Sequence, residues 1–402
     1  MTTPEPKAHQ EFRREVAGWL ERNRPAKPDF ILPQSFMEVD TQQQFDYLRD
    51  WQRKVYEAGY LGMAWPKEYG GGGQPQILQD IATQEMTRAN VPFMVNAIGL
   101  SWAGPTILHL GSEAHKKQFI KNILNAEEIW CQGFSEPDHG SDLGNAQCRA
   151  ERDGDHFVVN GAKIWTSLGV YAKHMILLAR SIPNTSSKYA GLSFFLCPMQ
   201  TPGIEVIPIK KITGEYGFNQ TVFTNARIHE STLVGEEGKG WLVAMAVLAF
   251  ERGAAGGQAG GNMSTVFSTQ DVIEMSRLIE RDGRPALEDP LVQDKLLNFL
   301  IDQRSIALTS QRARIEKLLT PERPAATMMM GKLFGSEFMR RLAYFAVELQ
   351  GGRANLYMGD PEAVQGGEWQ RAAMNAYSAT IGGGTSEVQH NILGERVLDL
   401  PK

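Results

Sequence analysis

Two segments of the chain carry residues whose types and spacing could do chemistry. The first, residues 131–145, reads Cys-Gln-Gly-Phe-Ser-Glu-Pro-Asp-His-Gly-Ser-Asp-Leu-Gly-Asn. Gly140 leaves room for a ligand to approach the backbone because it has no Cβ, and Ser135 and Ser141 add hydroxyl donors. A loop of this kind is typical of a ligand site, but it also occurs as an ordinary connection from helix to strand. These residues alone leave both interpretations open.

The second segment contains an isolated acid in apolar surroundings. Glu251 is the only acidic residue between Leu242 and Asp271, and it directly follows Phe250. A buried carboxylate without a partner is costly, and burial raises its pKa toward the range that suits a general base. The alternative is a salt bridge from Glu251 to Arg252 or to a neighbouring helix.

Hydrophobic periodicity predicts the elements that must hold these residues. From residue 8 to about 125 the apolar spacing is helical. Thr41-x-x-Gln44 predicts a capping box that opens a helix, and Gly59 is its expected C-cap. Further helices are expected around 76–89 and 113–124.

Between about 130 and 235 the pattern changes to short β-rich runs. Asp153-Gly154 and Asn160-Gly161 are tight-hairpin signals, and the spacing of the runs favours an antiparallel barrel or sandwich. The expected strands are 156–159, 162–165, 175–178, 192–197, 204–209 and 221–223. Helical periodicity returns at Gly238, with helices expected near 240–280, 288–319, 325–350, 361–378 and 385–398 and a turn at Pro321–Pro324.

Length and composition exclude several classes of protein. The chain has 402 residues, 42% hydrophobic and 22% charged, which predicts a globular protein of two or three domains. A net charge of −5 gives no electrostatic case for nucleic acid or an anionic membrane. Three cysteines lack any CxxC spacing, and the longest uncharged apolar run, Trp241–Phe250, is ten residues long. We therefore expect a soluble, cytoplasmic protein without membrane insertion.

The serine- and glycine-rich loop resembles the signature of a known family. Residues 133–145 (GFSEPDHGSDLGN) are similar to the acyl-CoA dehydrogenase pattern small–aliphatic–Ser/Thr–Glu–x–x–small–Gly–Ser/Thr–Asp–x–x–small, with Phe134 a mild departure. Three further segments resemble the family's flavin-facing strand, the start of its C-terminal bundle and its terminal flavin-binding helix. They are Val158–Ser167, Leu233–Trp241 and Gly384–Arg396.

The resemblance implies a mainly helical α+β fold of three domains. These are an N-terminal helical domain (1–128), a central β-barrel-like domain (129–236) and a C-terminal four-helix bundle (237–402). It also implies FAD as cofactor and a homotetramer, or a heterotetramer with a related subunit.

Site residues are carried over only where this sequence matches the family's motifs. The implied cofactor-binding residues are Gln132, Phe134, Ser135, Gly140, Ser141, Trp165, Thr166, Ser167, Gln350, Gly351, Thr385 and Glu387. The implied substrate-binding residues are Ser141, Arg252 and Gly384. Without the resemblance, Trp165 would be read as a core aromatic at a strand end. Neither a catalytic triad nor a metal-ligand spacing is found in the sequence.

The position of the catalytic base departs from the familiar pattern. Where many members read Tyr-Glu-Gly-Thr-Ser, this chain has Gly383 in place of the glutamate. A subset of the family, including isovaleryl-CoA and long-chain enzymes, carries the glutamate on the first helix of the C-terminal bundle, directly before an arginine. Leu248–Arg252 (LAFER) matches that arrangement. We therefore expect Glu251 to be the base and the backbone N–H of Gly383 to contact the thioester oxygen.

Other departures leave alternatives open. The family's Arg-x-x-Phe-Gly segment is replaced by Arg281-Asp-Gly-Arg284-Pro, so either arginine could serve. The Gln-x-x-Gly-Gly-x-Gly motif is replaced by residues 348–354, so either Gln350 substitutes in it or this part of the site is incomplete. Glycines at 253–261 indicate close helix packing or a cavity for a bulky acyl group.

The resemblance implies an FAD-dependent dehydrogenase that forms a trans-2-enoyl-CoA and passes electrons to electron-transfer flavoprotein. Local sequence likeness points to a branched, bulky, dicarboxylic or steroid side-chain acyl-CoA. The alternatives are an acyl-CoA oxidase-like or nitroalkane-oxidase-like relative, and an incomplete subunit of a heteromeric dehydrogenase.

Overall fold

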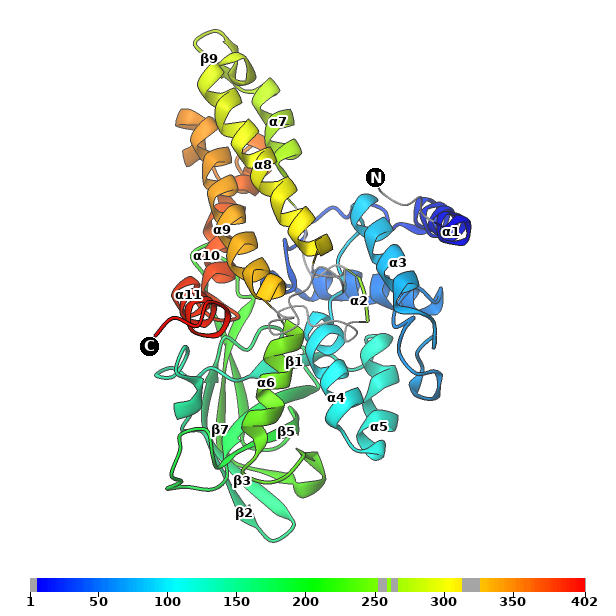
Figure 1. Ribbon diagram of the computed structural model, residues 1–402, viewed down its shortest axis with the longest axis vertical. Coiled ribbons are helices and arrows are strands. Elements are labelled where there is room, and N and C mark those ends of the chain that lie inside the picture. The colour runs from blue at the N-terminus through cyan, green and yellow to red at the C-terminus, as the bar shows by residue number, and fades with distance from the viewer. Residues whose placement is uncertain (1–5, 252–258, 262–266, 313–325, 402) are drawn as a thin grey trace. The chain divides into compact units, whose positions relative to one another are not determined.

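The computed structural model describes residues 6–251, 259–261, 267–312 and 326–401 (Figure 1). The chain divides into two compact units, Met1–Val266 and Phe267–Lys402. The first unit contains the N-terminal helices, an eight-stranded sheet and helix α6 (Gly240–Glu251). The second contains helices α7 to α11 and a short hairpin. None of the described helices is both long enough and apolar enough to cross a membrane.

The N-terminal helices form as their sequence predicts. They are α1 (Lys7–Asn23), α2 (Gln42–Glu57), α3 (Gln76–Arg88), α4 (Gly104–Leu110) and α5 (Glu113–Leu124). The predicted capping box is confirmed, because the Gln44 N–H donates to Thr41 Oγ1 and the Thr41 N–H donates to Gln44 Oε1, both at 3.3 Å. Gly59 follows α2 with a left-handed φ of 79°, as expected of a residue that ends a helix.

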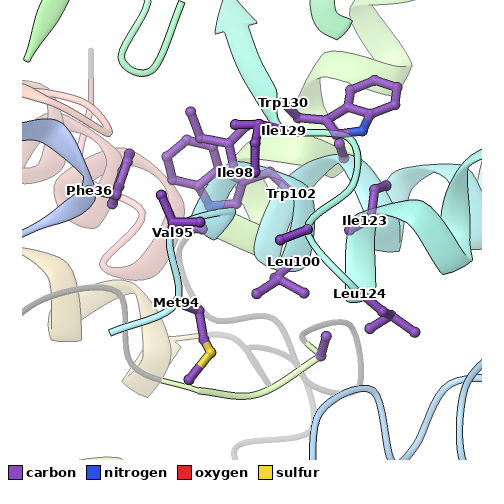
Figure 2. Close-up of a cluster of buried hydrophobic side chains, with 14 of the residues drawn as sticks. Phe36, Met94, Val95, Ile98, Leu100, Trp102, Ile123, Leu124, Ile129 and Trp130 are labelled. Atoms are coloured by element: carbon purple, nitrogen blue, oxygen red, sulfur yellow. The ribbon is translucent and has the colours of Figure 1, made fainter. Parts of the chain in front are cut away.

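One helical segment was not predicted. A π-helix at Gly99–Ala103 leads directly into α4, and all five of its residues are buried. Figure 2 shows Leu100 and Trp102 among other buried apolar side chains such as Ile98 and Phe36. The segment escapes sequence analysis because it is apolar or small on every side and so has no amphipathic period.

The eight-stranded sheet has the order β6-β7-β3-β2-β4-β5-β8, with β1 paired in parallel to β4. Its strands are β1 (Trp130–Gly133), β2 (Arg149–Asp153), β3 (His156–Ile164), β4 (His174–Arg180), β5 (Leu192–Pro198), β6 (Ile204–Ile209), β7 (Phe218–His229) and β8 (Leu233–Val234). One face buries its own apolar cluster, which includes Phe157, Leu177 and Phe195. Helix α6 packs on β5.

Of the two predicted hairpins, one is confirmed and one is wrong. Asp153 pairs with His156 and closes a tight turn between β2 and β3. Asn160 and Gly161 instead lie inside β3, opposite a bulge in β7. There the Asn225 N–H donates to Asn160 Oδ1 at 2.8 Å, and Asn225 has a left-handed φ of 49°. A Cβ at position 161 would lie 2.9 Å from the Cys148 Cα, so the glycine serves strand packing rather than a turn.

The bulge changes which residues of β7 are buried. Before it, Asn219, Thr221 and Phe223 are buried; after it, Ala226 and Ile228 are buried. Side chains alternate along a strand, so a bulge of one residue moves the buried set from odd to even positions.

The second unit is a helical bundle with its own core. Its helices are α7 (Thr269–Leu278), α8 (Pro290–Arg312), α9 (Ala326–Leu349), α10 (Glu368–Ile381) and α11 (Ser386–Ile392). Helices α8, α9 and α10 lie side by side (Figure 1), and Phe299, Phe345 and Trp369 belong to one buried cluster. The expected continuous helix over 240–280 is wrong, since residues 259–261 are not helical. The expected turn at Pro321–Pro324 lies outside the described residues.

His174, at the start of β4, is a histidine whose side chain is only 13% exposed and whose pKa is strongly shifted. Its ring stacks on Trp130 at 5.0 Å and meets Phe119 edge-on at 4.9 Å. Burial, with a smaller effect of the Lys173 charge, lowers its pKa from 6.5 to about 4. The Glu128 carboxylate, at 3.7 Å, is too far away for a hydrogen bond.

We expect this histidine to weaken the fold at mildly acidic pH. Between about pH 6.5 and pH 4 the unfolded chain takes up a proton that the folded chain refuses, so stability falls as pH falls, by at most about 3 kcal/mol. Denaturant unfolding of the native protein and of His174→Phe, measured across this range, tests the prediction. The loss of stability should be smaller in the variant, and parallel curves would contradict the assignment.

Candidate active site

The end of β1 and the loop after it form one wall of the candidate site. Gln132 and Ser135 are half-buried and Phe134 is buried. The Ile164 N–H donates to the Ser135 carbonyl at 2.9 Å. This bond ties the exit of β1 to β3 at the residue directly before Trp165, so the structure brings these predicted residues together.

A buried ion pair that sequence analysis missed fixes the loop. Lys163 Nζ donates to Glu136 Oε1 at 2.7 Å and to the Phe134 carbonyl at 3.1 Å, and the Lys163 side chain is fully buried. Glu136 also accepts from the N–H groups of Gln147 at 2.6 Å and Cys148 at 2.9 Å. Burial by itself raises the pKa of Glu136, but the Lys163 charge and these hydrogen bonds outweigh it and hold that pKa below its usual range.

Trp165 presents an exposed aromatic face. Its indole is 54% exposed, its backbone has a left-handed φ of 61°, and its ring meets Phe218 edge-on at 5.6 Å. The alternative reading of Trp165 as a core aromatic is therefore wrong. Large aromatic side chains usually lose most of their exposure on folding, so a rigidly held exposed indole marks a surface available to a planar ligand.

Thr166 anchors the turn that carries this indole. Thr166 and the following Ser167 are both buried. The Thr166 hydroxyl lies 3.1 Å from the Asn219 carbonyl and 2.9 Å from Thr221 Oγ1, and the Asn219 side-chain amide donates to the Thr166 carbonyl at 2.9 Å. These contacts show the Thr166 side chain engaged with β7, where it positions Trp165.

Gly140 and Ser141 lie on the exposed part of the loop. A Cβ at position 140 would have no atom of the described chain within 4 Å, so the space beside this glycine is open. Asp142, the next residue, pairs with Lys188 at 2.6 Å and thereby holds the outer end of the loop.

Glu251 is the last residue of α6, whose buried face includes Val243, Ala244 and Val247. The Phe250 ring lies 5.4 Å from the ring of His109 in α4. The Glu251 side chain and the whole of Arg252 lie outside the described residues.

The described end of the glycine segment is closely packed. The Ala259 N–H donates to the Leu100 carbonyl, and the Gly261 N–H donates to Thr83 Oγ1, both at 3.1 Å. A Cβ at position 260 would come within 2.0 Å of the Gln79 side chain. Gly260 and Gly261 are therefore closely packed, but in a non-helical stretch and not in the helix–helix contact that was expected. Residues 253–257 lie outside the described part.

In the second unit, Gly383 and Gly384 adopt backbone conformations that favour glycine. Their φ values are 66° and 91°. The Gly383 carbonyl accepts from Gln389 Nε2 at 2.8 Å, and Thr385 caps α11 by accepting from the Val388 N–H at 3.2 Å. Glu387 is exposed in the first turn of that helix.

The remaining predicted residues of this unit are arranged differently from the family pattern. Gln350 is buried; its Nε2 donates to the Ala346 carbonyl at 3.2 Å, and its Oε1 accepts from Gln370 at 2.8 Å. The expected cofactor contact of the Gln350 side chain thus conflicts with its use inside the bundle, while Gly351 is exposed. Arg281 and Arg284 lie opposite each other in the two short antiparallel strands of a hairpin.

The described residues offer no cluster of three or more His, Cys, Asp or Glu side chains that could hold a metal ion. The three cysteines are buried free thiols.

An N-terminal helical region, a central sheet with an exposed indole and a C-terminal helical bundle define a three-domain dehydrogenase architecture. Family models for the N-terminal, middle and C-terminal domains of acyl-CoA dehydrogenase match residues 6–127, 131–226 and 238–398. The chain belongs to the acyl-CoA dehydrogenase family and is an oxidoreductase of that class.

Similar proteins support this assignment along the whole chain. Acyl-CoA dehydrogenase IpdE1 of Mycobacterium tuberculosis is 36% identical over 403 residues, covering 98% of both chains. A solved structure described as the Tcur3481-Tcur3483 steroid ACAD is 27% identical, with a TM-score of 0.79 and complete coverage of both chains. The ChsE4-ChsE5 complex from Mycobacterium tuberculosis is 26% identical, with a TM-score of 0.77 and complete coverage of both chains.

Proposed function

We propose that this enzyme is an FAD-dependent acyl-CoA dehydrogenase that converts an acyl-CoA to the trans-2-enoyl-CoA. The observation that carries the cofactor part is the exposed Trp165 indole, held by Phe218 and by the Thr166–Asn219 contacts beside the loop that begins at Ser135. A fixed aromatic face next to backbone and hydroxyl donors suits a planar heterocycle.

The residues of the site fit FAD, which when bound accepts a hydride from the substrate β-carbon. We propose that Gln132, Phe134, Ser135 and the Trp165–Ser167 turn hold the flavin ring. Gly140 and Ser141 are exposed, with open space beside Gly140, and we propose that they face the cofactor and the thioester. The further proposed cofactor residues are Gly351, Thr385 and Glu387.

The proposed base is Glu251. Its carboxylate takes the α-proton of the thioester, and the Gly383 N–H donates to the thioester oxygen, where negative charge develops as the proton leaves. An α-proton is weakly acidic, so both actions are needed at the same time. Arg252 and Gly384 are the further proposed substrate contacts.

We also propose that the three domains meet at residues 128/129 and 236/237.

We propose a bulky substrate, such as a branched, dicarboxylic or steroid side-chain acyl-CoA, with electron-transfer flavoprotein as the electron acceptor. In support, one similar structure is described as a steroid ACAD and another as a complex of two proteins. By the same reasoning, the proposed assembly is a homotetramer or a heterotetramer with a related subunit.

Anaerobic reduction of the bound flavin by a panel of acyl-CoA thioesters tests the proposed activity. We expect the flavin absorbance to bleach with a bulky thioester and the enoyl-CoA to appear in equal amount. Bleaching without an enoyl product would contradict α,β-dehydrogenation. Rapid reoxidation by O₂ with release of hydrogen peroxide would point to an acyl-CoA oxidase instead.

A second candidate is a catalytically incomplete subunit of a heteromeric dehydrogenase. It is favoured by the internal use of Gln350 and by the Arg281–Arg284 hairpin that replaces the family's Phe-Gly. A purified chain that stays colourless after addition of FAD, and gains flavin only with a partner subunit, would support this alternative.

A further inference from the structure

The first unit contains a pocket whose lining residues lie outside those assigned to the active site. It is a cavity of about 300 Å³ between α2, the connection from α5 to β1 and the segment before β4. Its lining includes Arg49, Arg53 and Lys173, with Glu127 as the single carboxylate. Small-molecule sites begin at about this volume.

The cations of this pocket have spare hydrogen-bonding capacity. Arg49 and Arg53 lie one helical turn apart on α2, so their side chains project from the same face. Arg49 Nη2 contacts Asp46 at 3.0 Å and Asp50 at 3.4 Å, but its Nε is buried without a hydrogen-bond partner in the described chain.

The other two cations have no close carboxylate partner among the described residues, although the Lys173 charge acts on the nearby Glu128. Neither the Arg53 guanidinium nor the Lys173 ammonium forms an ion pair or a side-chain hydrogen bond there. Glu127 is exposed and bonds to the nearby Asn125 side chain at 3.3 Å. Positive charge that the protein leaves unpaired around a concave surface favours an anionic ligand.

The walls of the pocket are fixed before any ligand arrives. Phe45 and Tyr171 stack face to face at 4.3 Å with their planes 6° apart, and the Arg49 guanidinium lies 5.6 Å above the Phe45 ring. Ala126 is buried and adopts a left-handed φ of 58°, which is unfavourable for a residue other than glycine. A preformed site loses little free energy to ordering when it binds.

We propose that this pocket binds a phosphate monoester, such as a nucleoside monophosphate, at a site separate from the acyl-CoA site. Arginine guanidinium groups pair with phosphate oxygens through two parallel hydrogen bonds. The Arg53 guanidinium offers two parallel donors and the Lys173 ammonium a third, which together serve three oxygens. A carboxylate ligand, with two oxygens, would leave part of this set unused.

Isothermal titration of the whole protein with inorganic phosphate, AMP and adenosine tests the proposal. We expect AMP to bind and adenosine to fail, and Arg53→Gln with Lys173→Gln to weaken AMP binding by about tenfold or more, as loss of charge-assisted contacts predicts. Lys117→Gln, which removes one positive charge from an exposed site on α5, should leave the affinity unchanged.

Two outcomes would overturn the proposal. One is the absence of AMP and phosphate binding at millimolar concentration; the other is AMP binding that survives the double substitution, which would place it at another site. Titration with CoA distinguishes two possible ligands of the pocket, a free nucleoside monophosphate and the 3′-phosphate of CoA. If its binding falls as much as that of AMP in the double variant, the pocket holds the 3′-phosphate of CoA rather than a free nucleotide, and the claim of a separate site fails.

Discussion

Replacing Glu251 with glutamine is expected to lower the rate of flavin reduction by acyl-CoA about 10²–10⁴-fold, the usual contribution of a general base. Glutamine keeps the size and the helix propensity of glutamate but cannot accept the α-proton. Helix α6, whose packing depends on Val243, Ala244 and Val247, should therefore remain intact. Stopped-flow absorbance of the flavin measures the rate, and titration with substrate measures its affinity, which we expect to change little.

A matched control separates the base from a general charge effect. Glu237→Gln makes the same chemical change just before α6, at a side chain that pairs with Arg152 on the sheet at 2.9 Å. We expect this variant to reduce its flavin at the native rate. The assignment of the base fails if Glu251→Gln also keeps a near-native rate. The assignment also fails if Glu251→Gln loses its flavin, because Glu251 would then have a structural role.

The second large effect is expected from the ion pair between Glu136 and Lys163. Lys163→Met leaves the Glu136 carboxylate buried, at 6% exposure, without its cation. Removing one partner of a buried pair typically costs about 3–5 kcal/mol. Denaturant unfolding measures the loss, and flavin retention during gel filtration reports on the loop, since the same lysine also holds the Phe134 carbonyl.

Two further variants test this interpretation of the pair. Glu136→Gln combined with Lys163→Met should cost less than the two single changes added together, because no unpaired charge remains. Lys188→Met removes an exposed bridge to Asp142 and should change stability by no more than about 1 kcal/mol. If Lys163→Met and Lys188→Met lower the free energy of unfolding equally, burial of the Glu136–Lys163 pair adds nothing to the cost of removing its lysine.

Local sequence signals predicted the elements whose geometry is set by nearby residues. The Thr41 capping box and the Asp153-Gly154 turn formed as predicted because their hydrogen bonds close within a few positions. Asn160-Gly161 has the same local signal as a turn, but its role depends on Asn225 and Cys148, which are distant in sequence. Such long-range pairing cannot be inferred from a dipeptide.

The same limit applies to the site. The family motif drew attention to the loop from Ser135 and to Trp165, while the exposure of Trp165 became known only from the fold. Lys163, in contrast, lies in a strand where a lysine is usually solvated, and only the fold reveals that Glu136 pairs with it. The burial of Gln350 against Gln370 is likewise revealed only by the fold, since it depends on how α9 and α10 pack.

The bulge at Asn225 absorbs one extra residue, so that Phe223 before it and Ala226 and Ile228 after it remain in one apolar cluster. On one side of it, odd-numbered positions of β7 supply Asn219 and Thr221 to the turn beneath Trp165; on the other, even-numbered Ala226 and Ile228 fill the apolar interior. If Asn225 were paired regularly instead of bulging, the positions after it would exchange faces, so that Ala226 and Ile228 would leave the interior and Arg227 would enter it. One extra residue thus keeps the residues that anchor the Trp165 turn and those that fill the apolar interior on the same face of β7.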